Sequence, residues 1–343
     1  MSDKEQSMLT EFLCLTMGQE PAHAALGTLD IPDMFANSAS SEVRRETCAM
    51  ALGIMLFADL LERVPSGRGY VEGEAAAGRK VIFDHGALRT IRFAEGQTGA
   101  LPGGRDAFAR IFEPLGYRVV GTYPLPHLRM VGYVYCHEEH PEILPQYFVS
   151  ELEVAQFDAG FGQTAHRVFA ASADPIDDMS LGLLDCFART GAIGLEEAAE
   201  LLPILFSAFG RQHGDVRWRD YESLLAISPE AAWIATEGNA FNHATDRVED
   251  VTALAERLRV EGAPIKQAVE VSQNGRVRQT ALLADPVRRT FLDDEGALFE
   301  REVPGSFYEF ITRDLDPETG GLDLTFDSSN ATGIFSMTRK KAS

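Results

Sequence analysis

The chain contains 343 residues, of which 45% are hydrophobic, which allows a large buried core and suggests two or three domains or one large one. Its 52 acidic residues outnumber its 31 basic residues, and the formal net charge is −21. Nucleic acids and anionic membranes bind surfaces rich in Lys and Arg, so this charge argues against both as partners.

No segment of the sequence indicates export, a membrane span or an obligate protein partner. The segment 1–6 is acidic overall and lacks the features of a signal or transit peptide. The longest apolar run, residues 48–61, includes Asp59 and is too short to cross a bilayer, which predicts a buried helix. The four cysteines form no CxxC pair, so we expect reduced thiols in a cytoplasmic protein rather than a zinc site or disulfides.

Residues 1–70 carry helical periodicity and are predicted to form an N-terminal helical cap. The pattern then changes to a first module, residues 75–158. A strand at 81–83 is followed by an amphipathic helix at 105–115. Three further strands are expected at 117–121, 128–135 and 146–154. The predicted order of this module is therefore βαβββ.

Residues 160–228 return to a helical pattern and are interpreted as an inserted helical layer. Helices are predicted there at 179–190, 195–209 and 221–227. A second module follows at 230–343, with a strand at 233–235 and a helix at 248–260. Its other strands are predicted at 268–272, 277–284 and 306–312. The order βαβββ repeats, and two such half-barrels are expected to close around a shared cavity in an α+β fold.

A histidine and a glutamate occupy matching places in the two modules. His85 lies in Phe-Asp-His-Gly-Ala-Leu-Arg and His243 in Phe-Asn-His-Ala-Thr-Asp-Arg, and 66 residues after each stands a glutamate, Glu151 or Glu309. Imidazole and carboxylate suit first-row divalent metals, so the duplicated set indicates a metal site at the seam. Two histidines and one carboxylate would form an open facial triad, whereas four ligands would leave fewer free positions. The alternative is hydrogen-bonded core histidines and ion-paired glutamates.

Each of these histidines is followed four residues later by an arginine, Arg89 or Arg247. A guanidinium over the same cavity would bind a carboxylate through two parallel hydrogen bonds, which in an acidic protein indicates an anionic substrate. For Arg247 a salt bridge to the neighbouring Asp246 or Glu249 is an equal alternative.

Other chemical motifs find no support. The segment Cys-His-Glu-Glu-His-Pro at 136–141 spaces its histidines by three and ends in a helix-breaking proline, which excludes HExxH chemistry. The sequence contains no GxSxG elbow, Walker loop or dinucleotide-binding glycine fingerprint after a strand, so it supports neither a hydrolase nor a nucleotide-binding protein.

Four segments spread over most of the chain carry a resemblance to a known family. They are Phe-Asp-His-Gly-Ala-Leu-Arg-Thr at 83–90, Phe-Val-Ser-Glu-Leu at 148–152, Asn-Ala-Phe-Asn-His at 239–243 and Ser-Asn-Ala-Thr-Gly-Ile-Phe at 329–335. At these residues the sequence resembles the 2-oxoadipate dioxygenase/decarboxylase family. The resemblance implies a fold related to the vicinal oxygen chelate superfamily, with two βαβββ modules forming a β-barrel and with N-terminal and inserted helical layers.

The resemblance also implies an iron(II) cofactor held by two histidines and one glutamate. The family's metal ligands map onto His85, His243 and Glu309. Its substrate-binding arginine maps onto Arg89, and a backbone and a hydroxyl contact to substrate map onto Ala331 and Thr332.

The implied reaction converts 2-oxoadipate, or a similar 2-oxo dicarboxylate, with O2 into 2-hydroxyglutarate and CO2. Arg89 would pair with the distal carboxylate of the substrate, while Glu151 and Arg247 would be outer-sphere residues or an alternative ligand and anchor. Two other functions stay open: a non-redox metal-dependent lyase or isomerase of the glyoxalase type, and a non-catalytic protein that binds organic acids.

Overall fold

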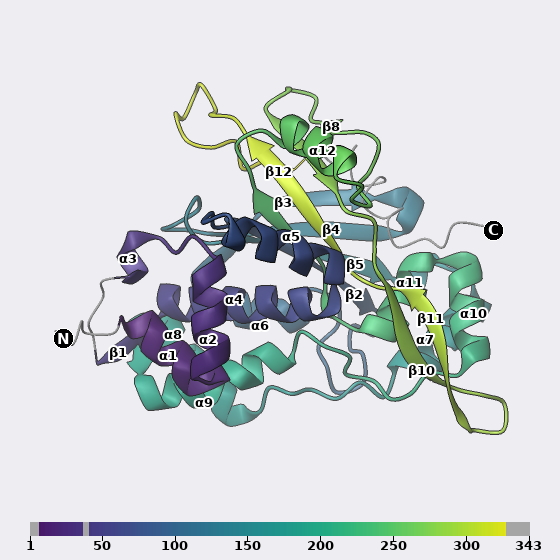
Figure 1. Ribbon diagram of the computed structural model, residues 1–343. Helices are drawn as coiled ribbons and strands as arrows, with labels where there is room; N and C mark the ends of the chain where they lie inside the picture. Colours follow the sequence, from purple (N-terminus) through teal and green to yellow (C-terminus); the bar gives the residue numbers. More distant parts are fainter. Residues whose placement is uncertain (1–6, 37–40, 327–343) are drawn as a thin grey trace.

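An eight-stranded sheet, curled into a half-barrel, forms the centre of the computed structural model, which describes residues 7–36 and 41–326 (Figure 1). The strand order is β3-β4-β5-β2-β7-β12-β9-β8. Four consecutive strands of this order come from each predicted module, so the two modules meet where β2 pairs with β7. Among the helices in the described residues, none combines the length and apolarity needed to span a membrane.

The first module has the predicted order βαβββ. Its elements are β2 (Phe83–Arg92), α6 (Asp106–Phe112), β3 (Tyr117–Leu125), β4 (Met130–His137) and β5 (Gln146–Glu153). The bounds predicted for the first strand, 81–83, are wrong, because β2 begins at Phe83 and carries the whole histidine motif. Residues 84–91 are all buried, as expected for a central strand covered on both faces.

The second module repeats this order within the sheet. Its elements are β7 (Phe241–Arg247), α12 (Val251–Val260), β8 (Glu270–Val271), β9 (Val277–Ala281) and β12 (Phe307–Arg313). The hairpin of β10 (Pro286–Leu292) and β11 (Leu298–Pro304) was not predicted from the sequence and forms a separate two-stranded sheet beside α7, α10 and α11 (Figure 1).

The predicted strand at 233–235 is wrong, because these residues lie within the helix α11 (Pro229–Glu237). Ser228 caps the helix by accepting a hydrogen bond from the backbone N–H of Ala231, and Pro229 occupies the first turn. A short apolar run containing Trp and Ile is compatible with either a strand or a buried helix, so periodicity alone could not decide.

The helices form two groups around the sheet. The N-terminal group comprises α1 (Met8–Met17), α2 (Gln19–Thr28), α3 (Asp33–Ala36), α4 (Arg45–Arg63) and α5 (Pro65–Ala76). The group between the modules comprises α7 (Ala159–Phe169), α8 (Asp178–Thr190), α9 (Leu195–Ser207), α10 (Trp218–Ile227) and α11. Two single-turn 3-10 helices follow β3 and β5, at Pro126–Leu128 and Val154–Gln156.

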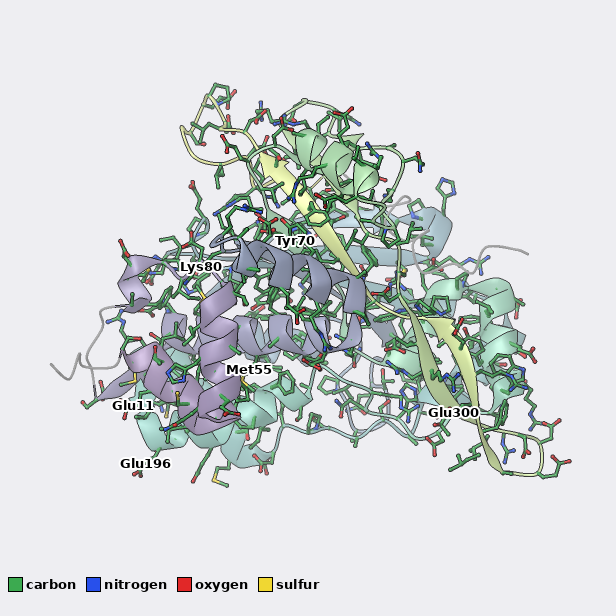
Figure 2. All side chains as sticks on the ribbon, viewed as in Figure 1. Glu11, Met55, Tyr70, Lys80, Glu196 and Glu300 are labelled. Carbon is green, nitrogen blue, oxygen red and sulfur yellow. The ribbon has the colours of Figure 1, made fainter. Side chains whose placement is uncertain are left out.

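The two helical groups are joined by direct contacts. A short strand not predicted from the sequence, β1 (Glu42–Arg44), pairs with β6 (Ala192–Gly194), and both α1 and α4 pack on α9. The helix α5 lies along the sheet and carries Tyr70 (Figure 2). The ring of Tyr70 packs 4.7 Å from Phe310 and 5.7 Å from Tyr308 of β12. The division at 1–70, 75–158, 160–228 and 230–343 stays a prediction.

The seam between the modules is a close backbone contact. β2 and β7 run antiparallel, β5 is parallel to β2, and β12 is parallel to β7. The strand next to the seam therefore has a parallel neighbour in each half of the sheet. At the centre, Gly86 pairs with Ala244. A Cβ atom on Gly86 would lie 2.3 Å from the ring of Phe241, so only glycine fits here.

We therefore expect Gly86→Ala to lower the free energy of unfolding by ~1–3 kcal/mol, because the added methyl group overpacks a buried seam. The measurement is urea denaturation. Gly69→Ala is the matched control: this glycine is exposed on α5 with nothing within 4 Å of the added methyl, and the change should raise stability by ~0.5–1 kcal/mol. Equal stability of the Gly86→Ala and wild-type proteins would contradict the proposed constraint.

Candidate metal centre

Three side chains from three neighbouring strands converge at the seam. His85 of β2, His243 of β7 and Glu309 of β12 each offer a ligand atom, and these atoms lie within 4.8 Å of one another. Each of the three residues is at most 3% exposed. Two imidazoles and one carboxylate form a donor set that suits a divalent transition metal.

His85 is oriented by a buried ion pair. Its Nδ1 lies 2.9 Å from Oδ1 of Asp84, which leaves Nε2 facing Glu309 Oε2 at 3.4 Å. Arg313 donates to the same Asp84 carboxylate at 2.8 Å. Burial opposes ionisation of Asp84, but the Arg313 charge and the bond from His85 hold the pKa of that carboxyl well below its usual range. A carboxylate behind the outer nitrogen is the usual support of a metal-ligating histidine.

His243 presents an unsatisfied nitrogen to the same point. Its Nε2 lies 3.6 Å from Glu309 Oε2 and has no hydrogen-bond partner among the described residues. Burial lowers the pKa of His243 to about 3, despite the nearby Glu309 carboxylate, so the ring is neutral. Its Nδ1 lies 3.1 Å from the side-chain amide nitrogen of Asn242, which precedes His243 in the chain as Asp84 precedes His85.

Glu309 is an anion held in a fixed orientation. Its Oε2 accepts a hydrogen bond of 2.8 Å from the hydroxyl of Thr245, its register partner on β7. Burial alone would raise the pKa of Glu309, but His243, His85 and Thr245 together lower it below the ordinary value. A buried carboxylate facing two imidazole nitrogens is a donor set that suits a divalent metal.

The predicted substrate arginine lies on the same face of the sheet. Arg89 follows His85 by four residues on β2, and side chains on alternate residues of a strand share a face. It is fully buried, and its guanidinium carbon lies 4.9 Å from the centre of the Trp233 ring. Its positive charge also contributes to the lowered pKa of His243. A cation therefore lies within electrostatic reach of the cluster.

The equal 66-residue spacing does not reflect equal positions in the sheet. In the second module, the residue two positions beyond His243 pairs in register with Glu309. In the first module, the residue two positions beyond His85 pairs in register with Phe148. Phe148, rather than Glu151, is therefore the spatial counterpart of Glu309. The inferred equivalence of the two glutamates is wrong, because the loops differ in length and the strands pair in a different register.

Glu151 lies outside the cluster, since it stands three residues beyond Phe148 and so points to the opposite face. Its carboxylate accepts from the backbone N–H of Arg105 at 2.7 Å and pairs with Arg92 at 2.9 Å. Arg247 is also outside: its guanidinium is 3.9 Å from Asp84 and donates to the Glu142 carbonyl.

Two further predicted residues, Ala331 and Thr332, lie outside the described residues. Sequence reasoning missed several side chains that surround the cluster, namely Asp84, Asn242, Thr245, Arg313 and Phe326. The first two had a visible signal, because an Asp or an Asn directly precedes the histidine in both copies of the motif. The ring of Phe326 packs 4.9 Å from that of His85, a contact that no sequence pattern predicts.

Paired βαβββ modules around this buried cluster define a protein of the vicinal oxygen chelate-like fold. The chain belongs to the 2-oxoadipate dioxygenase/decarboxylase family, whose model matches residues 53–321. Both the fold class and the family predicted from the sequence are thus confirmed. No curated protein matches the chain.

Similar crystal structures span nearly the whole chain. A protein assigned to the glyoxalase superfamily from Ralstonia eutropha JMP134 has a TM-score of 0.88 and 47% identity over 93% of this chain and 98% of that chain. The hydroxyglutarate synthase of Oryza sativa in complex with 2-oxoadipate has a TM-score of 0.67 and 18% identity over 91% and 95%. The Pseudomonas putida hydroxyglutarate synthase with 2-oxoadipate has a TM-score of 0.56 and 20% identity over 88% and 74%. At 18% and 20% identity, likeness shows the fold alone.

We expect His85→Ala, His243→Ala and Glu309→Ala each to lower divalent-metal affinity by about a hundredfold or more, because each removes one of three ligand atoms. Metal content after dialysis and calorimetric titration measure the effect, and far-ultraviolet circular dichroism checks the fold. Glu151→Gln is the matched control and should keep wild-type affinity. Wild-type metal content in all three alanine variants would contradict the assignment.

Proposed function

We propose that the protein is an iron(II)-dependent dioxygenase/decarboxylase that converts 2-oxoadipate, or a similar 2-oxo dicarboxylate, and O2 into 2-hydroxyglutarate and CO2. The observation that carries the proposal is the buried His85, His243 and Glu309 cluster with Arg89 on the same face. Family membership over residues 53–321 supports it. So does the presence of 2-oxoadipate in two hydroxyglutarate synthases of similar fold.

The protein's own residues prepare the site. Iron(II) held by three protein ligands keeps positions open at which a 2-oxo acid can chelate and O2 can be reduced. Asp84 holds the outer nitrogen of His85, so that Nε2 faces the cluster. Thr245 donates to Glu309 Oε2 and fixes the carboxylate. Because all four side chains are buried, water is largely excluded and each electrostatic interaction is strengthened.

Arg89 would hold the distal carboxylate of the substrate. Its guanidinium is planar and permanently charged, and it can bind a carboxylate through two parallel hydrogen bonds. A fully buried cation on the ligand-bearing face favours an acid with a second carboxylate over one with an uncharged end. The pairing would fix the far end of the substrate while its 2-oxo acid end lies at the cluster.

A second candidate is a non-redox lyase or isomerase of the glyoxalase type, which the 47% identical glyoxalase-superfamily protein favours. As predicted from the sequence, this alternative uses Glu151 as a fourth ligand of the metal. That carboxylate instead pairs with Arg92 on the other face of the sheet, which weakens the alternative. A non-catalytic organic-acid-binding protein would bind without turnover.

Oxygen uptake by anaerobically iron-loaded protein separates these functions. With 2-oxoadipate we expect one O2 consumed and one CO2 released for each 2-hydroxyglutarate formed. An oxygen electrode and mass spectrometry of the product measure this stoichiometry, and protein loaded with zinc is the control. Product formation without O2 would support the lyase or isomerase, and binding without product would support the binding protein.

Arg89→Lys keeps the charge but loses the planar fork, so kcat/KM for 2-oxoadipate should fall by orders of magnitude while metal content is retained. A lost contact of this kind typically costs ~2–5 kcal/mol when the partner charge stays buried. Arg247→Lys is the matched control, because that side chain is partly exposed and contacts Glu142 and Asp84. Equal losses in the two variants would contradict the assignment of the anchor.

A further inference from the structure

We propose that Trp233 is a positioning residue for Arg89 and thereby sets the preference of the site for 2-oxo dicarboxylates over 2-oxo monocarboxylates. This inference rests on the proposed function and deepens it. Trp233 affects substrate binding through Arg89, at the end of the substrate away from the metal ligands.

The indole of Trp233 is held rigidly beneath Arg89. Trp233 lies on α11, is 3% exposed, and has the Arg89 guanidinium carbon 4.9 Å from its ring centre. Its Nε1 donates a 3.1 Å hydrogen bond to the carbonyl of Gly305, just before β12. This bond fixes the rotation of the ring and ties it to the strand that carries Glu309.

A fixed aromatic face restricts where a guanidinium can lie. Arginine has several rotatable bonds, and stacking on an aromatic ring selects among their conformations. A bidentate pair with a carboxylate needs the guanidinium plane in one orientation, so a fixed ring reduces the ordering that substrate binding requires. The buried indole thus prepares Arg89 for the distal carboxylate.

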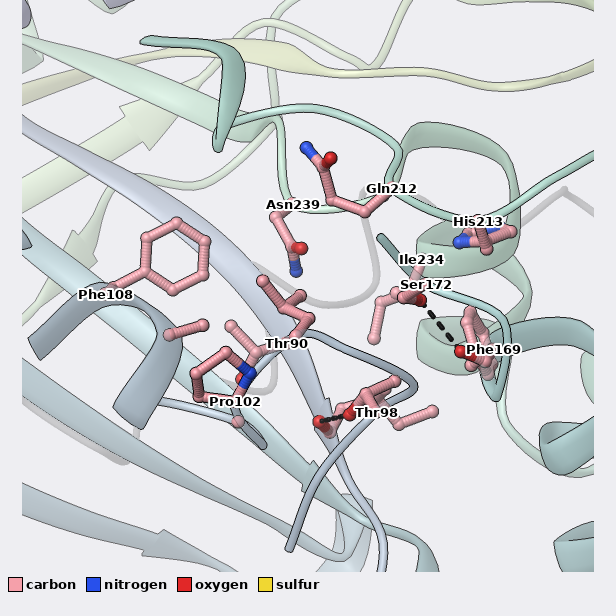
Figure 3. A pocket seen from close by; sticks show the side chains of 15 residues that line it. Thr90, Thr98, Pro102, Phe108, Phe169, Ser172, Gln212, His213, Ile234 and Asn239 are labelled. Atoms are coloured by element: carbon pink, nitrogen blue, oxygen red, sulfur yellow. Dashed lines mark hydrogen bonds between the residues drawn. The ribbon is translucent and has the colours of Figure 1, made fainter. Parts of the chain in front are cut away.

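The main chain of Arg89 is held from the same side. The side-chain amide of Asn239, two residues after α11 ends, donates a 2.8 Å hydrogen bond to the Arg89 carbonyl. Asn239 and Ile234 line a small cavity with Thr90 of β2 (Figure 3). Its volume is about 20 Å³, room for about one water molecule, so little empty space separates α11 from β2 there. Both ends of Arg89 are therefore positioned by one helix and the loop after it.

Removing the indole should change the affinity for 2-oxo dicarboxylates and 2-oxo monocarboxylates to different extents. A 2-oxo monocarboxylate of the same chain length, such as 2-oxohexanoate, can make the same contacts with the metal and its ligands but forms no ion pair with Arg89. Loss of the indole should therefore weaken binding of the dicarboxylate and leave the monocarboxylate nearly unaffected.

The test is calorimetric titration of zinc-loaded protein, which reports binding without turnover, with 2-oxoadipate and with 2-oxohexanoate. Trp233→Leu should weaken 2-oxoadipate by about tenfold or more, the effect of losing a desolvated cation–π contact, with little change for 2-oxohexanoate. Trp233→Phe keeps an aromatic face and should lose less. The other tryptophan of the chain, Trp218, packs against Phe291 of the separate hairpin, so Trp218→Leu is the matched control and should change neither affinity.

Two further measurements separate positioning from a general structural role. In the Trp218→Phe protein Trp233 is the remaining tryptophan, and its fluorescence should change on addition of 2-oxoadipate more than on addition of 2-oxohexanoate. In an Arg89→Met background, Trp233→Leu should have no additional effect on 2-oxoadipate affinity, since the residue it positions is gone.

Equal weakening of both acids by Trp233→Leu, or full additivity with Arg89→Met, would overturn the proposal. If Trp233→Leu does not fold, Trp233→Phe decides: an unchanged ratio of the two affinities overturns the proposal, and a reduced ratio supports it. Wild-type protein that fails to prefer 2-oxoadipate would overturn the proposed function as well. Wild-type preference that survives in both Trp233 variants would overturn this inference alone.

Discussion

The antiparallel pairing of β2 with β7 is the interaction on which the rest of the site depends, because it joins the two modules and decides which side chains share a face. His85 and His243 reach the same point from these two strands, and β12 adds Glu309 through its parallel pairing with β7. A slip of one residue in either pairing would turn a ligand to the opposite face of the sheet. The register is held by packing at the seam, where the Phe241 ring lies against Gly86 and leaves no room for a larger residue.

Much of this arrangement could be predicted from the repeat in the sequence. Both histidines were recognisable because each occurs in the same local motif, and the order βαβββ followed from the alternation of strand and helix patterns. The candidate carboxylate ligand was harder to assign, since Glu151 and Glu309 stand at equal sequence distances from their histidines. Sequence spacing counts loop residues, whereas position in a sheet depends on register, and in register the counterpart of Glu309 is Phe148.

The parts that escaped prediction depend on contacts between distant segments. Asp84 could be noticed beside its histidine, but its partner Arg313 lies 229 residues further on and carries no local signal. Trp233 was assigned to a strand because a short apolar run has no clear period. Because of that error, its contact with Arg89 could not be predicted. The hairpin at 286–304 was missed for a different reason: it pairs outside the main sheet and interrupts the repeat. Local patterns indicated the candidate ligands, and tertiary packing decided what surrounds them.

The ion pair behind His85 has a consequence for the charge balance of the occupied site. Asp84 and Arg313 neutralise each other, so neither adds to the net charge of the cavity. The Glu309 carboxylate offsets one of the two charges of the proposed divalent ion, and the buried Arg89 lies on the same face of the sheet. A 2-oxo dicarboxylate carries two negative charges, one end directed to the proposed ion and the other to Arg89. Because a low-dielectric interior strongly disfavours net charge, ion and dicarboxylate should each strengthen retention of the other.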